Sequence, residues 1–252
     1  MQSGPDKQAG RVSFRNRRLP LRELGLPPAG SVHLWYLDLG RLGNPMHGDP
    51  DASAPGLLTP RQQRTVRRFY LRLLLGAYLG VPGKQVKISR QIRGKPVLDP
   101  AHHPQAFDFS IAGSDGNCLI GISSAGNIGV DLELVNRRPG KPLALSRRYF
   151  SPDEIQVLGA VDAEQRNRAF MHTWACKEAV VKAAGHGIAN RLNRFSVNAL
   201  PWESPAILAM QDDDAACWQL AIVYPGDRHV GAVAVRQPSL SIEAFSLLPA
   251  SG

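Results

Sequence analysis

The pattern of hydrophobic and polar positions changes its period several times along this chain. Residues 33–39 contain the aromatic pair Trp35 and Tyr36 among leucines, near an alternating pattern, which predicts a strand. Thr59 and Pro60 then supply a helix N-cap and a first-turn proline, and apolar residues follow at steps of three and four. We therefore expect a helix that begins at residue 60 and ends near Gly80.

The second half of the chain shows comparable patterns. Ser151, Pro152 and Glu154 have the spacing of a capping box, and a longer helical pattern covers residues 163–184 before Gly185. Strand-like segments flank these helices at residues 107–135, 195–199, 217–224 and 229–235. Because strand, helix, strand and strand follow one another in both halves, the sequence predicts an α+β fold with two similar subdomains.

The expected organisation has four parts. Residues 1–30 form a basic, flexible leader, and residues 31–127 form an N-terminal α+β subdomain. Residues 128–237 form a C-terminal α+β subdomain, and residues 238–252 form a tail.

Composition narrows the class of protein. The 252 residues are 43% hydrophobic and 20% charged, which is typical of a globular chain. No run of about 18 apolar residues is present, so we expect no membrane span. The three cysteines are widely spaced and form neither a disulfide framework nor a zinc pattern. This cysteine usage favours a reduced, cytoplasmic setting.

The positive charge favours an anionic partner. Lysine and arginine number 30 against 21 acidic residues, a net charge of +9. Residues 1–28 hold six basic and two acidic residues, which is +4 of that total, so the remainder is only mildly basic. Nucleic-acid binding rests on this charge alone, because no zinc-finger, RNP or basic-zipper pattern accompanies it.

Residues 128–135 alternate between an aliphatic set and a set that contains Asp131 and Glu133. Since alternate strand residues share a face, the two carboxylates point together, away from the aliphatic side. They repel each other unless solvent or a cation separates them. Two interpretations stay open here, a solvent-exposed strand face and half of a site for a hard cation such as Mg²⁺.

Two rows of side chains on the predicted helices carry chemistry. Trp174, Glu178 and Lys182 recur every four residues and so lie along one helix face. A Glu–Lys pair at this spacing is usually a surface pair, but here it continues an aromatic stripe, which favours partial burial. In the first long helix, Arg64, Arg68 and Arg72 line one face, as either a solvated surface or a cationic row beside an anion.

Together these motifs resemble the 4′-phosphopantetheinyl transferase superfamily, in its larger pseudo-dimeric class. The matching segments are RGKPVL (93–98), FDFSIAGS (107–114), GVDLE (129–133), YFSPDE (149–154), WACKEAVVKAAGHGI (174–188) and RFSV (194–197). The resemblance implies two subdomains related by a pseudo-two-fold axis, with the active cleft between them, in a monomer. It also implies Mg²⁺-dependent transfer of the 4′-phosphopantetheine arm of coenzyme A to a serine of an acidic acyl or peptidyl carrier protein, with release of 3′,5′-ADP. Mn²⁺ is an alternative metal, and neither nucleic acid nor membrane is expected as a partner.

The resemblance also implies roles for individual residues. Asp131, Glu133 and Glu178 match the three metal ligands, and Asp131, Glu178 and Lys182 match the catalytic residues. Contacts to coenzyme A are matched by Ser110 and by Lys95 with its neighbour Pro96. A further contact is matched by an arginine of the first long helix, which is either Arg64 or Arg68, with Arg72 as another alternative.

One position departs from the family. Ile111 stands where the family has a histidine that helps to hold the 3′-phosphate of coenzyme A. His102, His103, Lys95 and Arg93 are near enough in sequence to replace it. The departure also leaves an alternative function, a catalytically lapsed relative that binds coenzyme A or a carrier protein without transfer.

Overall fold

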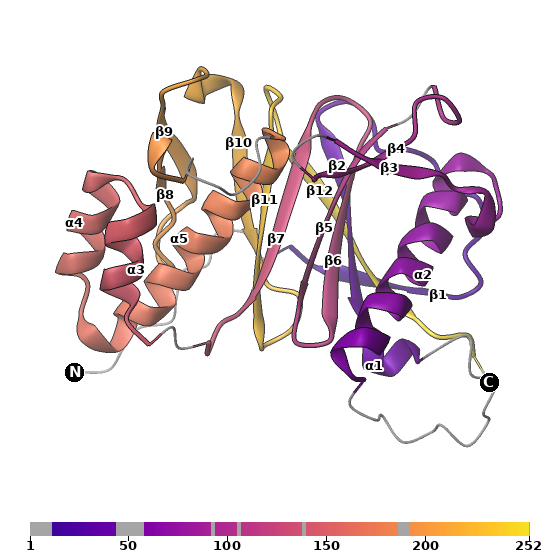
Figure 1. Cartoon of the computed structure of the whole chain (residues 1–252), viewed down its shortest axis with the longest axis horizontal. Coiled ribbons are helices and arrows are strands. Elements are labelled where there is room, and N and C mark those ends of the chain that lie inside the picture. Colours follow the sequence, from indigo (N-terminus) through magenta and orange to yellow (C-terminus); the bar gives the residue numbers. More distant parts are fainter. Residues whose placement is uncertain are drawn as a thin grey trace.

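The computed structural model describes residues 12–43, 58–91, 94–104, 107–137, 140–185 and 192–251. Two sheets lie side by side, and each carries one long helix (Figure 1). The helices are α1 (Leu39–Leu42), α2 (Pro60–Leu79), α3 (Pro142–Tyr149), α4 (Pro152–Ala160) and α5 (Ala163–Ala183), with 3₁₀ turns η1 (Gly83–Gln85), η2 (Leu192–Arg194) and η3 (Ala215–Cys217). The predicted α+β class is confirmed.

Twelve strands are described in these residues. They are β1 (Phe14–Arg18), β2 (Ser31–Asp38), β3 (Ile88–Arg90), β4 (Pro96–Leu98), β5 (Asp108–Ser114), β6 (Asn117–Ser123), β7 (Ile128–Leu134), β8 (Phe195–Asn198), β9 (Ala206–Met210), β10 (Gln219–Val223), β11 (His229–Val235) and β12 (Ser241–Leu248). The first sheet has the order β1-β12-β2-β6-β5, and the second has the order β10-β11-β7. Two small sheets, β3-β4 and β8-β9, complete the fold.

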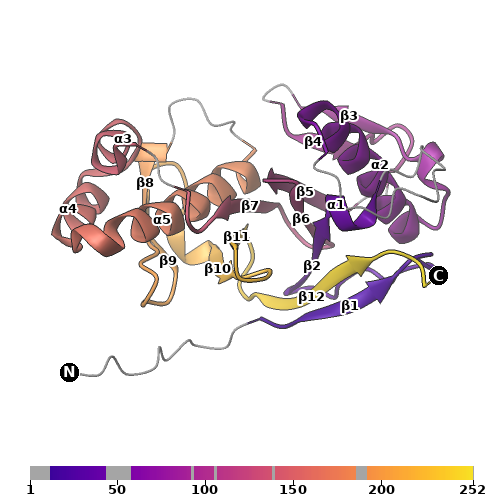
Figure 2. The same ribbon diagram turned by 90° about the horizontal axis from the view of Figure 1, so that it is seen from below.

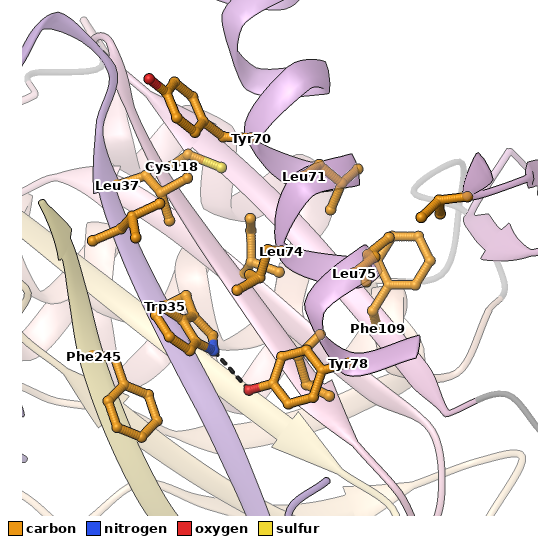
Figure 3. Packing of buried hydrophobic residues seen from close by; sticks show 14 of the residues in the cluster. Trp35, Leu37, Tyr70, Leu71, Leu74, Leu75, Tyr78, Phe109, Cys118 and Phe245 are labelled. Atoms are coloured by element: carbon orange, nitrogen blue, oxygen red, sulfur yellow. Dashed lines mark hydrogen bonds between the residues drawn. The ribbon is translucent and has the colours of Figure 1, made fainter. Parts of the chain in front are cut away.

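The long helix of the first half, α2, begins and ends where the sequence predicts. The Thr59 hydroxyl accepts a hydrogen bond from the Gln62 amide in a capping box, and the helix ends at Gly80, which has a φ of 66°. Its apolar stripe packs on the first sheet, where the Trp35 indole donates to the Tyr78 hydroxyl at 2.8 Å (Figure 3). This packing fixes α2 beside β5.

The two ends of the chain differ from the expectation. The predicted tail, residues 238–252, contains β12, which pairs in parallel with both β2 and β1. The predicted leader, residues 1–30, contains β1, and its first eleven residues lie outside the described part. Figure 2 shows β1 and β12 running together below the other strands. The expectations of a flexible leader and a separate tail were therefore wrong for these strands, because β12 buries Phe245 and Leu247 in the first core.

Side chains join the two sheets where main-chain pairing stops. The Asp108 carboxylate of β5 accepts from the Ile128 amide of β7 at 2.8 Å, and the Ser110 hydroxyl accepts from the Val130 amide at 3.0 Å. These side-chain bonds supply partners for amides that no neighbouring strand reaches. We call β5 and β7 together the β5–β7 seam; in Figure 2, α5 lies to the left of it and α2 to the right.

Two further expectations can be compared with the structure. The cysteines Cys118, Cys176 and Cys217 are all free. Among the described residues, no helix combines the length and the apolar character needed to cross a membrane. The pseudo-two-fold relation of the halves and the division at residue 127 stay predictions.

Candidate functional site

The site is built on β7, whose two faces have different partners. Ile128, Val130 and Leu132 enter a hydrophobic core, as the alternation predicts. Asp131 and Glu133 are also buried, at 6% and 9% exposure, so the interpretation as a solvent-exposed face is excluded. A buried pair of carboxylates needs a cation or protons nearby.

A close approach of α5 covers the acidic face of β7. A Cβ atom added to Gly129 would lie 1.9 Å from the Ala179 carbonyl oxygen and 2.4 Å from the Ala183 nitrogen. Only glycine leaves room for the helix backbone at this distance. Gly129 in the GVDLE motif therefore sets how near α5 comes to the carboxylates of β7.

α5 contributes two charged residues of the predicted site. Lys182 Nζ lies 2.6 Å from Asp131 Oδ1, and Glu178 is 4% exposed. The other carboxylate oxygen, Asp131 Oδ2, is buried and has no hydrogen-bond partner among the described residues. The structure thus brings Asp131, Glu178 and Lys182 together, and it leaves one anionic oxygen without a partner.

The surroundings shift the protonation of the acids. Burial raises the pKa of Glu178 to about 7; Lys182 opposes this shift, and the charges of Asp131 and Glu133 add to it. Burial, followed by the charge of Asp131, raises the pKa of Glu133, although Arg137 donates to this carboxylate at 2.9 Å. Buried acids whose charges repel one another are a setting that a divalent cation stabilises.

The donor chemistry fits Mg²⁺, which prefers carboxylate oxygens. Across the residues that the structure describes, however, no three His, Cys, Asp or Glu side chains stand close enough together to hold an ion as they are. The Asp131 carboxylate is paired with the Lys182 ammonium through Oδ1. The buried and unpartnered Asp131 Oδ2 is the observation that fits a role as a cation ligand. Asp131, Glu133 and Glu178 remain proposed ligands.

A buried ion pair next to Glu178 anchors α5, and sequence reasoning missed it. Lys177 is fully buried, and its Nζ lies 2.7 Å from both carboxylate oxygens of Glu154 and from the Phe195 carbonyl oxygen. Glu154 also accepts from the amides of Ser151 and Val197. The pair therefore ties α4, α5 and β8 together. Two sequence features could have indicated this pair: the glutamate of a capping box, and a lysine within a helix that is buried on most sides.

The aromatic stripe of α5 packs against α3 and the residues that follow it. Trp174 is half-buried, and its ring stacks on Phe170 at 5.8 Å between centroids and meets Tyr149 edge-on at 5.7 Å. This confirms the partial burial expected for the stripe. It also places Trp174 at the edge of its hydrophobic cluster rather than at its centre.

The expected coenzyme A contacts on the first half are engaged in the seam. Lys95 Nζ lies 2.6 Å from Asp108 Oδ2 and 3.1 Å from the Ile128 carbonyl oxygen. Ser110 is buried and bound to Val130, and Pro96 is the first residue of β4. The structure thus brings Lys95 and Ser110 to the strand that carries Asp131. Their contacts to coenzyme A stay predictions.

The three arginines predicted to line one face of α2 have different surroundings. Arg64 and Arg68 are exposed. They lie along the same row of the helix as Leu71 and Leu75, which are buried further along and pack near Phe109 of β5 (Figure 3). Arg72 donates to the Val86 carbonyl and so supports η1. Arg67, which the sequence analysis did not select, lies half-buried against Gly113 of β5. The sequence feature that could have identified Arg67 is its position one helical turn before Leu71, which is buried.

Comparison with known proteins adds three findings. The model of the 4′-phosphopantetheinyl transferase superfamily matches residues 127–234. The chain is similar to the 4′-phosphopantetheinyl transferase HetI of Nostoc sp., with 36% identity over 214 residues that cover 81% of this chain and 87% of the relative. It is also similar to the transferase Sfp of Bacillus subtilis, with 28% identity over 70% of this chain and 82% of that protein.

A weaker likeness is found among solved structures. A holo-(acyl-carrier-protein) synthase from Bacillus anthracis, in complex with CoA, has 22% identity over 45% of this chain and 96% of that chain. Its TM-score is 0.36.

Proposed function

Because the chain belongs to the 4′-phosphopantetheinyl transferase superfamily, we propose that it transfers the 4′-phosphopantetheine group of coenzyme A to a serine of an acyl or peptidyl carrier protein. The observation that carries this proposal is the junction of β7 and α5, where Asp131 and Glu178 lie buried beside Lys182. Both sides of the seam belong to one chain, so the proposed active form is a monomer.

The reaction is a displacement at phosphorus. The serine oxygen attacks the phosphorus that bears the pantetheine arm, and a new P–O bond forms. The bond from that phosphorus to the oxygen that bridges the diphosphate breaks, and 3′,5′-ADP leaves with the bond's electron pair. Such a reaction needs in-line positioning and neutralisation of charge on the phosphoryl oxygens.

Lys182 and Glu178 fit two separate tasks. The Lys182 ammonium would neutralise a phosphoryl oxygen once it is released from Asp131, which it contacts at 2.6 Å. Glu178, whose pKa burial raises to about 7, would accept the proton of the serine hydroxyl, directly or through water. A general base is most effective when its pKa lies near the working pH.

Asp131, Glu133 and Glu178 would hold Mg²⁺. When bound there, the ion would supply Lewis-acid stabilisation of the diphosphate charge. Their burial supports this role, because charges at a dry site act more strongly on one another than charges in water do.

The carrier protein is proposed to be acidic around its serine. The chain carries a net charge of +9, so an acidic partner would be attracted over a distance. This attraction acts more on the rate of encounter than on affinity.

An intact-mass assay tests the proposal. The protein is incubated with coenzyme A, Mg²⁺ and several apo carrier proteins, and each carrier should gain the mass of one phosphopantetheine arm. A known transferase serves as the positive control. If none of the carriers gained mass while the control worked, the proposal would be overturned.

One observation favours a second candidate, a relative that binds without transferring. The carboxylates do not form a ligand cluster within the described residues, and Lys182 pairs with Asp131. Such a protein would bind coenzyme A in calorimetry, yet no carrier would gain mass. Alanine at Glu178 would then leave the measured binding unchanged.

A further inference from the structure

Exposed apolar side chains gather on the outer side of the C-terminal half. Five large hydrophobic side chains are exposed among the described residues, and three of them are Val157 on α4, Trp202 in the turn after β8, and Leu208 on β9. Trp202 is 48% exposed and Leu208 is 61% exposed. Single exposed apolar residues are ordinary on a protein surface, whereas a group of them around one hollow indicates a binding surface.

These three side chains line one groove. A hollow of about 310 Å³ lies between α4 and the strands β8 and β9, and it includes Val157 and Leu208. A second hollow, of about 350 Å³, lies at the corner where α4 meets α5, and it includes Val157 and Trp202. Leu200 lines both hollows as well, so they are neighbours along one groove, which we call the α4 groove. In Figure 1, α4, β8 and β9 lie at the left, on the far side of α5 from the seam.

The margins of the α4 groove are acidic. Asp153, Asp162 and Glu203 line it and are exposed, whereas the charge of Glu154 beneath them is paired with Lys177. None of the described residues that line either hollow is a lysine, an arginine or a histidine. Asp153 and Asp162 also stabilise the N-terminal ends of α4 and α5, but Glu203 stands in a turn and has no such role. The groove is thus a negative surface on a chain with a net charge of +9.

This charge determines which partner the groove fits. An acidic rim attracts a cationic partner and repels an anionic one. The carrier proteins proposed as substrates are acidic around their serine, so the groove would repel that region. An apolar floor inside a charged rim is the arrangement of a protein interface, and an exposed tryptophan is a common anchor of one. The groove therefore fits a protein that is apolar and basic.

The backbone beside the groove favours a helix as the occupant. The Val197 amide of β8 donates to Glu154 Oε1 of α4 at 2.9 Å. An added strand would need such donors along the edge of β8, so it would have to break this bond. A bound helix satisfies its own main-chain groups and needs only an apolar stripe that fills the groove.

We propose that the α4 groove binds a basic amphipathic helix of another protein. The apolar stripe of that helix contacts Val157, Trp202 and Leu208, and its lysines or arginines pair with the acidic margins. This interaction goes beyond the proposed transfer reaction and does not depend on it. Because the groove lies apart from the junction of β7 and α5, the chain could hold this partner while the active cleft is occupied.

Three synthetic peptides of about 18 residues, or five helical turns, test the proposal. The first has leucines at helical spacing along one face and lysines on the other. The second has glutamate in place of each lysine, and the third has the composition of the first but leucines spread around the helix. Calorimetry with the full chain should show binding of the first peptide alone, and this binding should weaken as salt is added. The tryptophan emission of the chain should shift to the blue as the Trp202 indole leaves water.

Variants of the groove locate the binding. Trp202→Ala and Leu208→Ser should each weaken the affinity for the first peptide about tenfold or more, as expected for anchor residues. Glu203→Gln should weaken it about threefold and reduce its salt dependence. Leu26→Ser and Glu23→Gln are the matched controls, because both residues are exposed and lie outside the groove. All five variants should keep the wild-type rate of transfer to a carrier protein, and a thermal melt checks that each retains the fold.

The outcomes separate this inference from its alternatives. Equal binding of the three peptides, no binding of the first, or wild-type affinity in both Trp202→Ala and Leu208→Ser would overturn it. It would also be overturned if these two variants lost transfer to the carrier, which would assign the groove to the substrate, or if Leu208→Ser dissociated a wild-type dimer, which would assign it to a second copy. A wild type that binds the first peptide but modifies no carrier would remove the proposed function and leave this inference standing.

Discussion

The two long helices hold their charges in opposite ways. α5 carries charges that are paired: Lys177 binds Glu154 in the interior, and Lys182, which is partly exposed, binds the buried Asp131. α2 is held by an apolar stripe, and the side chains of Arg61, Arg64, Arg67 and Arg68 have no ion pair with any carboxylate in the described ranges. The comparison indicates that α5 fixes charged groups in position, whereas the four arginines of α2 are not held by ion pairs within the described ranges.

The anchor of α5 gives the largest expected effect. Lys177→Met should lower the free energy of unfolding by about 3–5 kcal/mol, because it leaves the buried Glu154 charge without its cation. Urea denaturation measures this change. Arg194→Met, which breaks an exposed pair with Asp212, is the control and should cost less than about 1 kcal/mol. Equal effects of the two variants would remove the contrast between buried and exposed pairs.

The contact of α5 with β7 should be nearly as sensitive. Gly129→Ala forces the helix backbone away from the strand, and we expect a loss of about 3 kcal/mol, at the upper end for overpacking. The displacement also moves Glu178 relative to Asp131, so the transfer rate should fall with stability. A variant with wild-type melting temperature and rate would show that the close approach is not required.

The burial of α5 also predicts a pH dependence. Burial lowers the pKa of His172 from 6.5 to about 4, so the ring is neutral in the folded chain while it takes a proton in the unfolded chain. Stability is therefore lost as the pH falls from 6.5 towards 4. At about 1.4 kcal/mol per pH unit, the loss approaches about 3 kcal/mol.

The matched variant for this pH dependence is His172→Gln, which removes the titrating ring. Its free energy of unfolding should depend less steeply on pH in this range than that of the wild type. Denaturation curves at several pH values measure the difference. Parallel pH profiles for the two proteins would contradict the prediction.

The acids of the site are expected to control turnover. Asp131→Ala or Glu178→Ala should lower the transfer rate by about 10²-fold or more, because each removes a proposed metal ligand, and the second also removes the base. Steady-state kinetics with a carrier protein measures this. Wild-type rates in either variant would remove the assignment of the metal site.

The exposed cations of α2 should have the smallest effect. Arg64→Ala and Arg68→Ala should each raise KM for coenzyme A by a few-fold, since exposed charges are screened by solvent and salt. The effect should shrink further as salt is added. A loss of kcat with unchanged KM would instead place these residues at the reacting atoms.

Sequence patterns predicted the parts of the fold that depend on local order. The N-cap at Thr59 and the capping box at Ser151 were predicted because a cap depends on residues that lie within one turn of each other. Burial of Asp131 was left open, because alternation along a strand does not say what covers each face. The place of β12 was missed because its pairing with β2 joins residues at opposite ends of the chain.

The candidate site was predicted from charged motifs, and residues that act through packing were missed. Asp131, Glu178 and Lys182 stand out because paired charges at fixed spacing indicate chemistry. Lys177 and Arg67 carry the same kind of charge, but their meaning depends on burial against Glu154 and Gly113, which lie far away in sequence. Only the fold brings these residues together.

The central claim is that the junction of β7 and α5 performs metal-dependent transfer of phosphopantetheine. The most direct measurement is the intact mass of an apo carrier protein after incubation with the enzyme and coenzyme A, with Mg²⁺, with a chelator, and with Mg²⁺ restored. The account predicts one added arm with Mg²⁺, none with the chelator, and recovery when the metal returns. Unchanged carrier mass under all three conditions, or full modification in the presence of the chelator, would contradict it.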